Sequence, residues 1–202
     1  MNHRLPVTLA DIMTCDVRSV TPETSLQEVA KIMSEAGISS LLIGPLEKTL
    51  GIITESTILR AMHWRLPSHT AVSEVMSQPL VTAPPDLGLL GARKLIEAHS
   101  IRHLVVVAPD GATIGIVSET DFRRHLGVLA FQHLQTLASA MDREMPHLPP
   151  SSNLDAALTR MLQRASDYIL VSEHGKPLGI LTERDIPRLL SCYPNACEIP
   201  LG

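Results

Sequence analysis

Apolar residues follow two alternating patterns along this chain. In the first 65 residues, Leu26, Val29 and Met33 recur at helical spacing, and two almost wholly apolar runs then follow over Ser40–Ile43 and Leu50–Ile53. The spacing of three and four residues predicts an amphipathic helix. The continuous runs are typical of strands that are covered on both faces.

The pattern repeats along the chain and ends each time in a related phrase. The three phrases are Gly51–Thr57, Gly115–Asp121 and Gly179–Asp185, and their glycines lie 64 residues apart (115−51 and 179−115). A fixed period of this length indicates tandem structural repeats. Each phrase ends a strand and begins a second helix, which predicts an α/β (α+β) fold with the order strand, helix, strand, strand, helix in each repeat.

The period sets the expected domain boundaries. Leu9, Val72 and Leu137 each precede their glycine by 42 or 43 residues (51−9, 115−72 and 179−137). One more period places a further start at Leu201, so we expect the chain to be the front part of a longer protein. The predicted boundaries are repeat one over 7–66, repeat two over 67–130, repeat three over 131–192 and a tail over 193–202.

Local signals refine the ends of the helices. Thr24 and Gln27 form a candidate capping box, and Gly37 is suited to ending the first helix. The corresponding helices are expected over Leu87–His99 and Leu154–Arg164. The helix after the second phrase is predicted to run from Glu119 towards Ala138, either as a linker packed on the core or as a dimer contact.

Composition excludes several classes of protein. The 202 residues include 45% hydrophobic residues, carry a net charge of −4, and contain only two Phe, two Tyr and one Trp. Nucleic-acid binding is not expected, because there is no basic block and few aromatic residues for stacking. No apolar run reaches the ~18 residues that a membrane helix needs. Three cysteines, an odd and sparse set, predict reduced thiols and a cytoplasmic protein.

The repeats resemble the CBS domain, which is named after cystathionine β-synthase. The resemblance rests on Asp11–Thr14 and Glu74–Ser77 at the repeat starts, on the prolines after the first strands, and on the three Gly-x-x-Ser/Thr phrases. It implies that repeats pair into a pseudo-twofold module that binds an adenosine-containing ligand and regulates an attached domain. The chain also resembles the sensor segment of larger bacterial signalling proteins.

The resemblance implies a first nucleotide site between repeats one and two. Ser118 and Asp121 would hold the ribose, and Arg18, Ser39 and Ser40 of repeat one would face them. A carboxylate can accept both ribose hydroxyls, and a guanidinium can pair with phosphate. AMP, ADP, ATP and S-adenosylmethionine are all candidate ligands.

A second cleft would be centred on Thr54 and Thr57, with Arg102 and His103 contributed by repeat two. Thr57 stands where the family has an aspartate, and the loss of this charged acceptor should weaken ribose binding by roughly 1–3 kcal/mol. We therefore expect this site to be empty or weak.

Repeat three has a complete phrase in Thr182 and Asp185. Its expected partner is a fourth repeat. In this chain, repeat three should stay exposed or pair with repeat three of a second copy, because uncovered apolar surface drives association. The sequence therefore predicts a homodimer, with an effector domain following in the full-length protein.

Other interpretations of the same residues are open. Ser/Thr-x-x-Asp is also a helix-capping signature, which needs no ligand. His99 and His103 are four residues apart, but a helix end between them argues against a metal site. No nucleophile elbow, P-loop or dinucleotide motif is found, so an enzyme is not expected. The alternative to a regulatory sensor is a structural dimerisation scaffold with empty clefts.

Overall fold

The computed structural model describes residues 8–130 and 144–194, without the side chains of residues 126–130. These residues belong to two compact units, each of which is described by itself. Unit 1 comprises Met1–Val20, Leu42–Gly51 and Gln78–Met141, and unit 2 comprises Thr21–Leu41, Ile52–Ser77 and Asp142–Gly202. Repeat one thus contributes to both units, and repeat three lies in unit 2.

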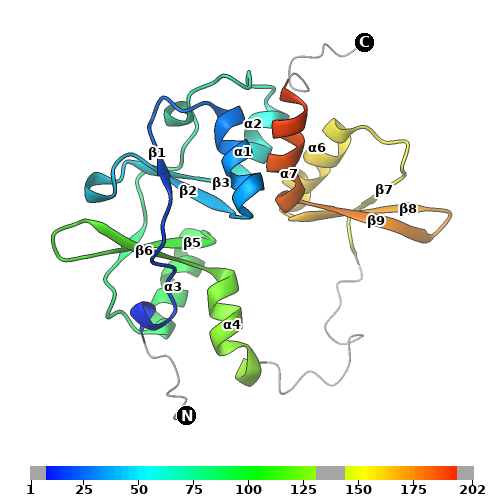
Figure 1. Cartoon of the computed structure of the whole chain (residues 1–202). Helices are drawn as coiled ribbons and strands as arrows, with labels where there is room; N and C mark the ends of the chain where they lie inside the picture. The colour runs from blue at the N-terminus through cyan, green and yellow to red at the C-terminus, as the bar shows by residue number, and fades with distance from the viewer. Residues whose placement is uncertain (1–7, 131–143, 195–202) are drawn as a thin grey trace. The chain divides into compact units, whose positions relative to one another are not determined.

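Each repeat has the predicted order of elements (Figure 1). Repeat one contains β1 (Ser19–Val20), α1 (Leu26–Ala36), β2 (Ser40–Ile43), β3 (Gly51–Thr54) and α2 (Glu55–His63). Repeat two contains β4 (Thr82–Ala83), α3 (Leu89–His99), β5 (His103–Val107), β6 (Thr113–Ser118) and α4 (Glu119–Ala130). Repeat three contains β7 (His147–Leu148), α6 (Leu154–Arg164), β8 (Tyr168–Glu173), β9 (Lys176–Thr182) and α7 (Ile186–Cys192). The short 3-10 helices are η1 (Leu9–Asp11), η2 (Leu46–Lys48), η3 (Val72–Glu74) and η4 (Glu183–Asp185).

Each repeat forms its own three-stranded sheet. The strand orders are β1-β2-β3, β4-β5-β6 and β7-β8-β9. In all three sheets the first strand is parallel to the second, since the first helix forms the crossover between them. The second and third strands of repeats two and three are antiparallel and are joined by short turns that contain Gly111 and Gly175, both at positive φ.

The helix boundaries correct two details of the sequence prediction. Ser25, not Thr24, is the N-cap of α1, because its side chain accepts a hydrogen bond from the Glu28 amide. Gly37 ends this helix as predicted, in the left-handed conformation at φ 63°. In repeat three, Thr182 is followed by η4 before α7 begins, so the second helix starts later than the phrase. The expected extension of α4 beyond Ala130 lies outside the described residues.

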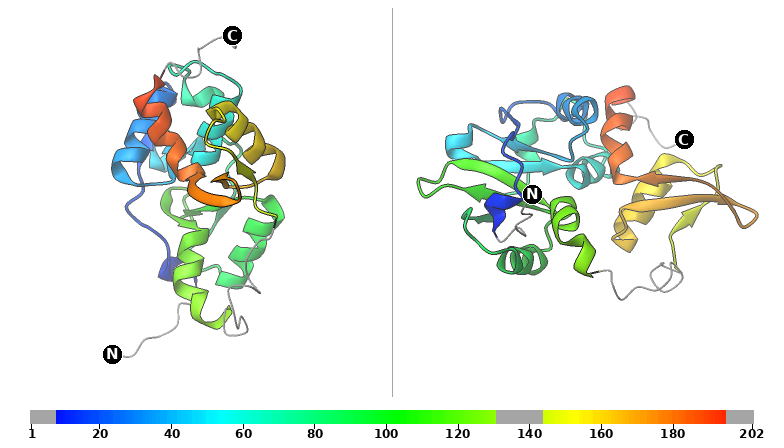
Figure 2. Two further views of the ribbon diagram at one scale, coloured as in Figure 1. Left: turned by 90° about the vertical axis from the view of Figure 1, so that its right-hand side faces the viewer. Right: turned by 60° about the horizontal axis from the view of Figure 1, so that its bottom comes forward.

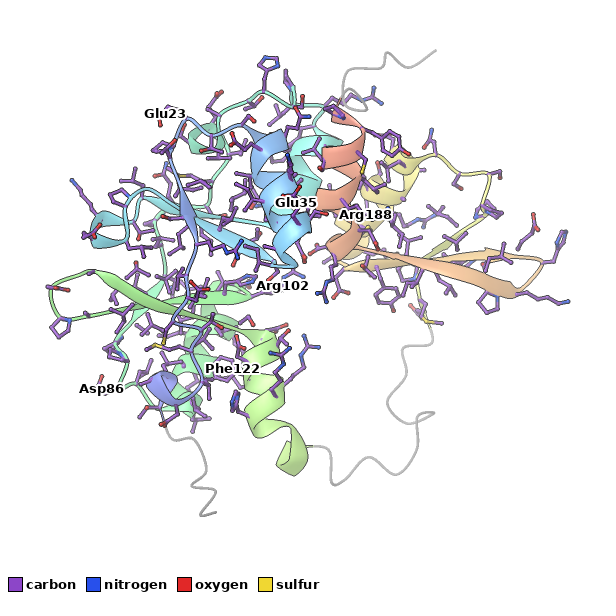
Figure 3. The ribbon with its side chains drawn as sticks, in the orientation of Figure 1. Glu23, Glu35, Asp86, Arg102, Phe122 and Arg188 are labelled. Atoms are coloured by element: carbon purple, nitrogen blue, oxygen red, sulfur yellow. The ribbon has the colours of Figure 1, made fainter. Side chains whose placement is uncertain are left out.

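The core of unit 1 lies between the sheet of repeat two and its helices. Leu9 and Leu104 are fully inaccessible, and they belong to one cluster with residues from α3, β4, β6 and α4. Phe122 joins this cluster from α4 (Figure 3). Leu9 precedes its cluster neighbours in repeat two by 74 to 113 residues (83−9 and 122−9), so the segment that starts repeat one is part of the core of repeat two.

The core of unit 2 is built from helices of repeats one and three. α7 packs against α1 and α2, and α6 packs against α2. Figures 1 and 2 both show α7 alongside α1. The buried residues at the contacting helices include Met33, Ile58, Met161, Ile186 and Leu190. The expectation that repeat three has no partner within its own chain is therefore wrong for its helical side, although most of β9 is exposed.

Candidate functional site

Ser118 and Asp121 form the best-defined part of the predicted nucleotide site. Ser118 ends β6 and Asp121 lies in the first turn of α4. The Asp121 carboxylate accepts hydrogen bonds from the Ser118 amide at 2.8 Å and from its hydroxyl at 2.6 Å. The carboxylate is therefore held at the start of the helix, as a capping interaction requires.

This capping arrangement leaves the carboxylate able to bind a ligand. Both hydrogen bonds from Ser118 use the same carboxylate oxygen, Oδ2. An ionised carboxylate has about four lone-pair sites on its two oxygens, so Asp121 has acceptor capacity beyond these two bonds. Capping fixes the side chain in one orientation, and an oriented acceptor loses less entropy when it binds a ligand hydroxyl. Capping and ribose binding are thus compatible functions of one residue.

Arg102 and His103 lie next to this phrase within repeat two. His103 is paired with Ser118 across the β5–β6 ladder, and the Arg102 carbonyl accepts a hydrogen bond from the Glu119 amide at 3.2 Å. Arg102, labelled in Figure 3, immediately precedes the start of β5. The sequence analysis assigned both residues to the cleft of Thr54 and Thr57. The sequence numbers of Arg102 and His103 within the repeat did not reveal that their backbone lies beside Ser118.

His103 is held in its neutral form. The pKa of His103 is lowered from 6.5 to about 4, first by burial and then by the positive charge of Arg102, while the negative charge of Asp121 acts in the opposite direction. At neutral pH the imidazole therefore carries one N–H donor and one acceptor nitrogen. A neutral imidazole beside a carboxylate suits the hydrogen-bonding edge of a base or a sugar better than a phosphate.

The three candidates from repeat one fall in different units. Arg18 is exposed just before β1 in unit 1, and its carbonyl accepts a hydrogen bond from the Leu42 amide at 3.1 Å. Ser39 and Ser40 lie in unit 2, where the Ser39 carbonyl accepts from the Glu55 amide at 3.2 Å. Their common role with Asp121 stays a prediction.

In the phrase of repeat one, the polar side chains make hydrogen bonds within the phrase and with the helix that follows it. Thr54 is the N-cap of α2 and accepts from the Thr57 amide at 3.4 Å. Thr57 is almost fully buried, and its hydroxyl lies 3.4 Å from a guanidinium nitrogen of Arg60. Thr57 offers no carboxylate at the position where repeats two and three have Asp121 and Asp185, and the weak site expected there stays a prediction.

In repeat three, Thr182 and Asp185 reproduce the arrangement of repeat two. Asp185 Oδ2 accepts from the Thr182 amide at 3.0 Å and from its hydroxyl at 2.9 Å. Its Oδ1 lies 3.7 Å from Arg188, which projects from α7 (Figure 3). Arg184, Asp185 and Arg188 line a hollow of about 240 Å³ together with residues from the end of α1 and with Glu55.

Sequence reasoning missed these surroundings of Asp185. Arg188 follows Asp185 by three residues on a helix, which is a recognisable ion-pair spacing. The hydrogen bond from the Ser56 hydroxyl to Glu183, at 2.9 Å, had no signal in the sequence because it joins residues 127 positions apart. The third phrase thus faces helices of repeat one.

Within residues 8–130 and 144–194, no group of three His, Cys, Asp or Glu side chains is arranged to hold a metal ion. In the same ranges, no helix combines the length and apolar character needed to cross a membrane.

Comparison with known proteins identifies the family. The model of the CBS domain matches three segments of this chain, residues 9–63, 72–128 and 137–191. The chain therefore belongs to the CBS domain family and contains three repeats of it. A CBS domain-containing protein, YhcV of Bacillus subtilis, is 33% identical over 112 residues, which cover 55% of this chain and 79% of YhcV.

Other relatives are longer enzymes. The inosine-5'-monophosphate dehydrogenase of Korarchaeum cryptofilum is 33% identical over 106 residues, which cover 52% of this chain and 21% of the dehydrogenase. The chain thus corresponds to a small part of such relatives.

Solved structures share the fold. Protein MJ1225 of Methanocaldococcus jannaschii, described as a putative archaeal homolog of g-AMPK, aligns with a TM-score of 0.78 at 18% identity, covering 96% of this chain and 77% of MJ1225. The CBS domain pair of protein MJ0100, solved in complex with 5-methylthioadenosine and S-adenosyl-L-methionine, aligns with a TM-score of 0.56 at 26% identity, covering 60% of this chain and 98% of that pair.

Proposed function

We propose that this protein is a ligand-sensing regulatory module that binds an adenosine-containing nucleotide at the Ser118 and Asp121 phrase. The observation that carries the proposal is the Asp121 carboxylate, which is oriented by two hydrogen bonds from Ser118 and retains acceptor capacity for ribose hydroxyls. Neutral His103 lies opposite Ser118 on the neighbouring strand and adds a polar side chain without charge to this region.

The ligand class is supported by a related pair of CBS domains. MJ0100 is named as a complex with two adenosine-containing compounds, and it is 26% identical to the part of this chain that it covers. We extend this ligand class to repeats one and two, with Arg18, Ser39 and Ser40 as the contributors from repeat one. AMP, ADP, ATP and S-adenosylmethionine are the ligands to test.

Regulation of an effector completes the proposal. Ligand that binds one arrangement of the repeats better than another shifts the population towards that arrangement. Enzymes such as the dehydrogenase carry a related segment as a minor part of their length. We propose that this chain acts in the cytoplasm on an attached or partner effector and has no catalytic activity of its own.

Calorimetric titration of the full chain with each of the four ligands tests the proposal. We expect one ligand to bind, and Asp121→Asn to weaken it about tenfold or more, since the substitution removes the charge of the acceptor. Asp185→Asn is the matched control, because Asp185 has the same capping bonds but lies in repeat three. An absence of heat with all four ligands would favour the alternative of a scaffold with empty clefts.

A further inference from the structure

The segments that start repeats one and two occupy matching positions on the other repeat's elements. We call Thr8–Thr14 leader 1 and Ala71–Ser77 leader 2. Leader 1 lies on repeat two in unit 1, and leader 2 lies on α1 and β3 of repeat one in unit 2. The apolar residue at the second position of each leader, Leu9 or Val72, is fully buried.

The two leaders make the same hydrogen bonds. Each donates two consecutive amides to carbonyls just before the N-cap of the first helix, and each pairs further on with the third strand. For leader 1 the bonds are Leu9 to Leu87 at 3.0 Å, Ala10 to Pro85 at 2.9 Å and Thr14 to Ile116 at 2.9 Å. For leader 2 they are Val72 to Thr24 at 2.9 Å, Ser73 to Pro22 at 3.1 Å and Ser77 to Ile52 at 2.8 Å. Leaders 1 and 2 thus bind through the same set of backbone hydrogen bonds.

Repeat three has an open groove at the equivalent place. Counted from the N-cap Asn153, the acceptor positions correspond to Ser152 and Pro150, and within the described part of the chain no backbone amide donates to either carbonyl. A cavity of about 780 Å³ lies there, lined by residues at the start of α6 and at the end of α7. We call it groove 3; its lining includes Pro150, Ser152, Asn153, Leu154, Ala157 and Cys192.

The apolar lining of groove 3 matches the surroundings of a buried leader. Leu9 belongs to one core cluster with Leu89, Ala92 and Leu104. The equivalent residues of repeat three, Leu154, Ala157 and Ile169, all line groove 3. A groove of this lining therefore suits a leucine at the second position of a leader.

Leaders 1 and 2 also pair with the third strand of the repeat that they bind, and the third strand of repeat three has no such pairing among the described residues. Ile52, which pairs with leader 2, is 8% exposed, whereas its counterpart Ile180 is 59% exposed. A Cβ atom at Gly115 would approach the Met13 sulfur of leader 1 to 2.6 Å, whereas at Gly179 no atom of the described residues lies within 4 Å of this position. Two separate surfaces of repeat three are thus open where a leader would bind.

The chain contains a third sequence of this type. Thr136-Leu137-Ala138 is identical to Thr8-Leu9-Ala10 of leader 1, and the three CBS matches begin at Leu9, Val72 and Leu137. We call residues 136–142 leader 3. Each leader described in the structure binds a repeat other than the one it begins. By the same rule, leader 3 should not bind the repeat that it begins. Groove 3 in repeat three of a second copy is an available place for it.

We propose that groove 3 binds leader 3 of a second copy, so that two chains exchange these segments symmetrically through their third repeats. Leu137 would fill the apolar part of the groove, and the amides of Leu137 and Ala138 would donate to Ser152 and Pro150 of the other copy. Such an exchange is self-complementary, as a twofold interface must be. It would also cover the exposed Leu178 and Ile180. The proposal is independent of nucleotide binding.

A native thiol in groove 3 allows a direct test. The full chain would carry Leu137→Cys in a background of Cys15→Ser and Cys197→Ser, which leaves Cys192 as the other thiol. After treatment with a short bismaleimide, a denaturing gel should show a covalent dimer, and Cys192→Ser should abolish it. A product of single-chain mass with both thiols consumed would mean that leader 3 folds onto its own repeat. That result, or no cross-linking, would overturn the proposal.

Matched variants guard against non-specific linkage. Leu90→Cys in the same background places a thiol on a residue of repeat two that is 72% exposed and lies outside groove 3, and we expect no dimer from it. In sedimentation equilibrium, Leu137→Asp should raise the dimer dissociation constant about tenfold or more, since a charge cannot enter an apolar groove without loss. An unchanged dissociation constant would also contradict the proposal.

Discussion

Repeats two and three carry the same ligand phrase but differ in what covers them. In both, an aspartate at the start of the second helix accepts two hydrogen bonds from the preceding Ser or Thr. Repeat two has leader 1 in place, and Leu9 is fully buried in its core. In repeat three, groove 3 holds no leader among the described residues, and most of β9 is exposed. The phrase therefore forms from local sequence, whereas the core of repeat two is completed by a segment that begins repeat one.

The strongest test of this difference compares apolar residues from the two repeats. Leu9→Ala should lower the free energy of unfolding by about 2–5 kcal/mol, because it leaves a cavity in the core of repeat two. Leu178→Ala removes a side chain of repeat three that is 60% exposed, and it should change the free energy of unfolding by only about 0.5 kcal/mol. Urea denaturation at protein concentrations too low for association measures both. Equal losses of unfolding free energy in the two variants would contradict this difference between repeats two and three.

A pH titration of stability tests the environment of the phrase in repeat two. The pKa of His103 is about 4 in the folded protein and 6.5 when unfolded, so between these values the unfolded chain binds the extra proton. Stability should therefore be full above pH 6.5 and fall as the pH drops towards 4, by about 3 kcal/mol for this group.

The comparison protein is His103→Gln, which keeps a polar side chain but does not titrate. It should lose less unfolding free energy than the wild type between pH 7 and pH 4.5, with carboxylates titrating in both. Parallel curves for the two proteins would show that His103 titrates normally in the folded state.

The glycines of the two phrases provide a smaller effect. Gly115→Ala should cost about 1–2 kcal/mol, because the new methyl group meets Met13 of leader 1. Gly179→Ala has free space and should be neutral within about 0.5 kcal/mol in dilute solution. Thermal unfolding measures both, and adding Met13→Ala should recover part of the loss at Gly115. If Gly179→Ala weakens self-association as well, it supports a leader from a second copy beside β9.

The sequence predicted the repeat unit because the unit depends on local patterns. Apolar runs, the glycine period and the hydroxyl at each helix start were enough to predict the strands and most helices, and the family comparison confirmed three CBS repeats. The N-cap of α1 was misplaced by one residue, since Thr24 and Ser25 are both good caps.

What the sequence did not reveal depends on contacts between distant segments. The packing of α7 on α1 brings together helices from repeats three and one, and no pattern in the sequence pairs these two helices. The Ser56–Glu183 hydrogen bond likewise joins residues 127 positions apart. The position of His103 beside Ser118 required the register of the β5–β6 ladder, which a count along the repeat does not give.

Photolabelling with an azido-adenine nucleotide, followed by peptide mapping, tests the central claim most directly. The account predicts one principal labelled region, in the peptides around His103 or Ser118–Asp121, and loss of this label when unmodified ligand is added in excess. It also predicts that Asp121→Asn reduces the label and that Asp185→Asn leaves it in place. Specific labelling around Thr182–Arg188 alone, or no competable label in any peptide, would contradict the account.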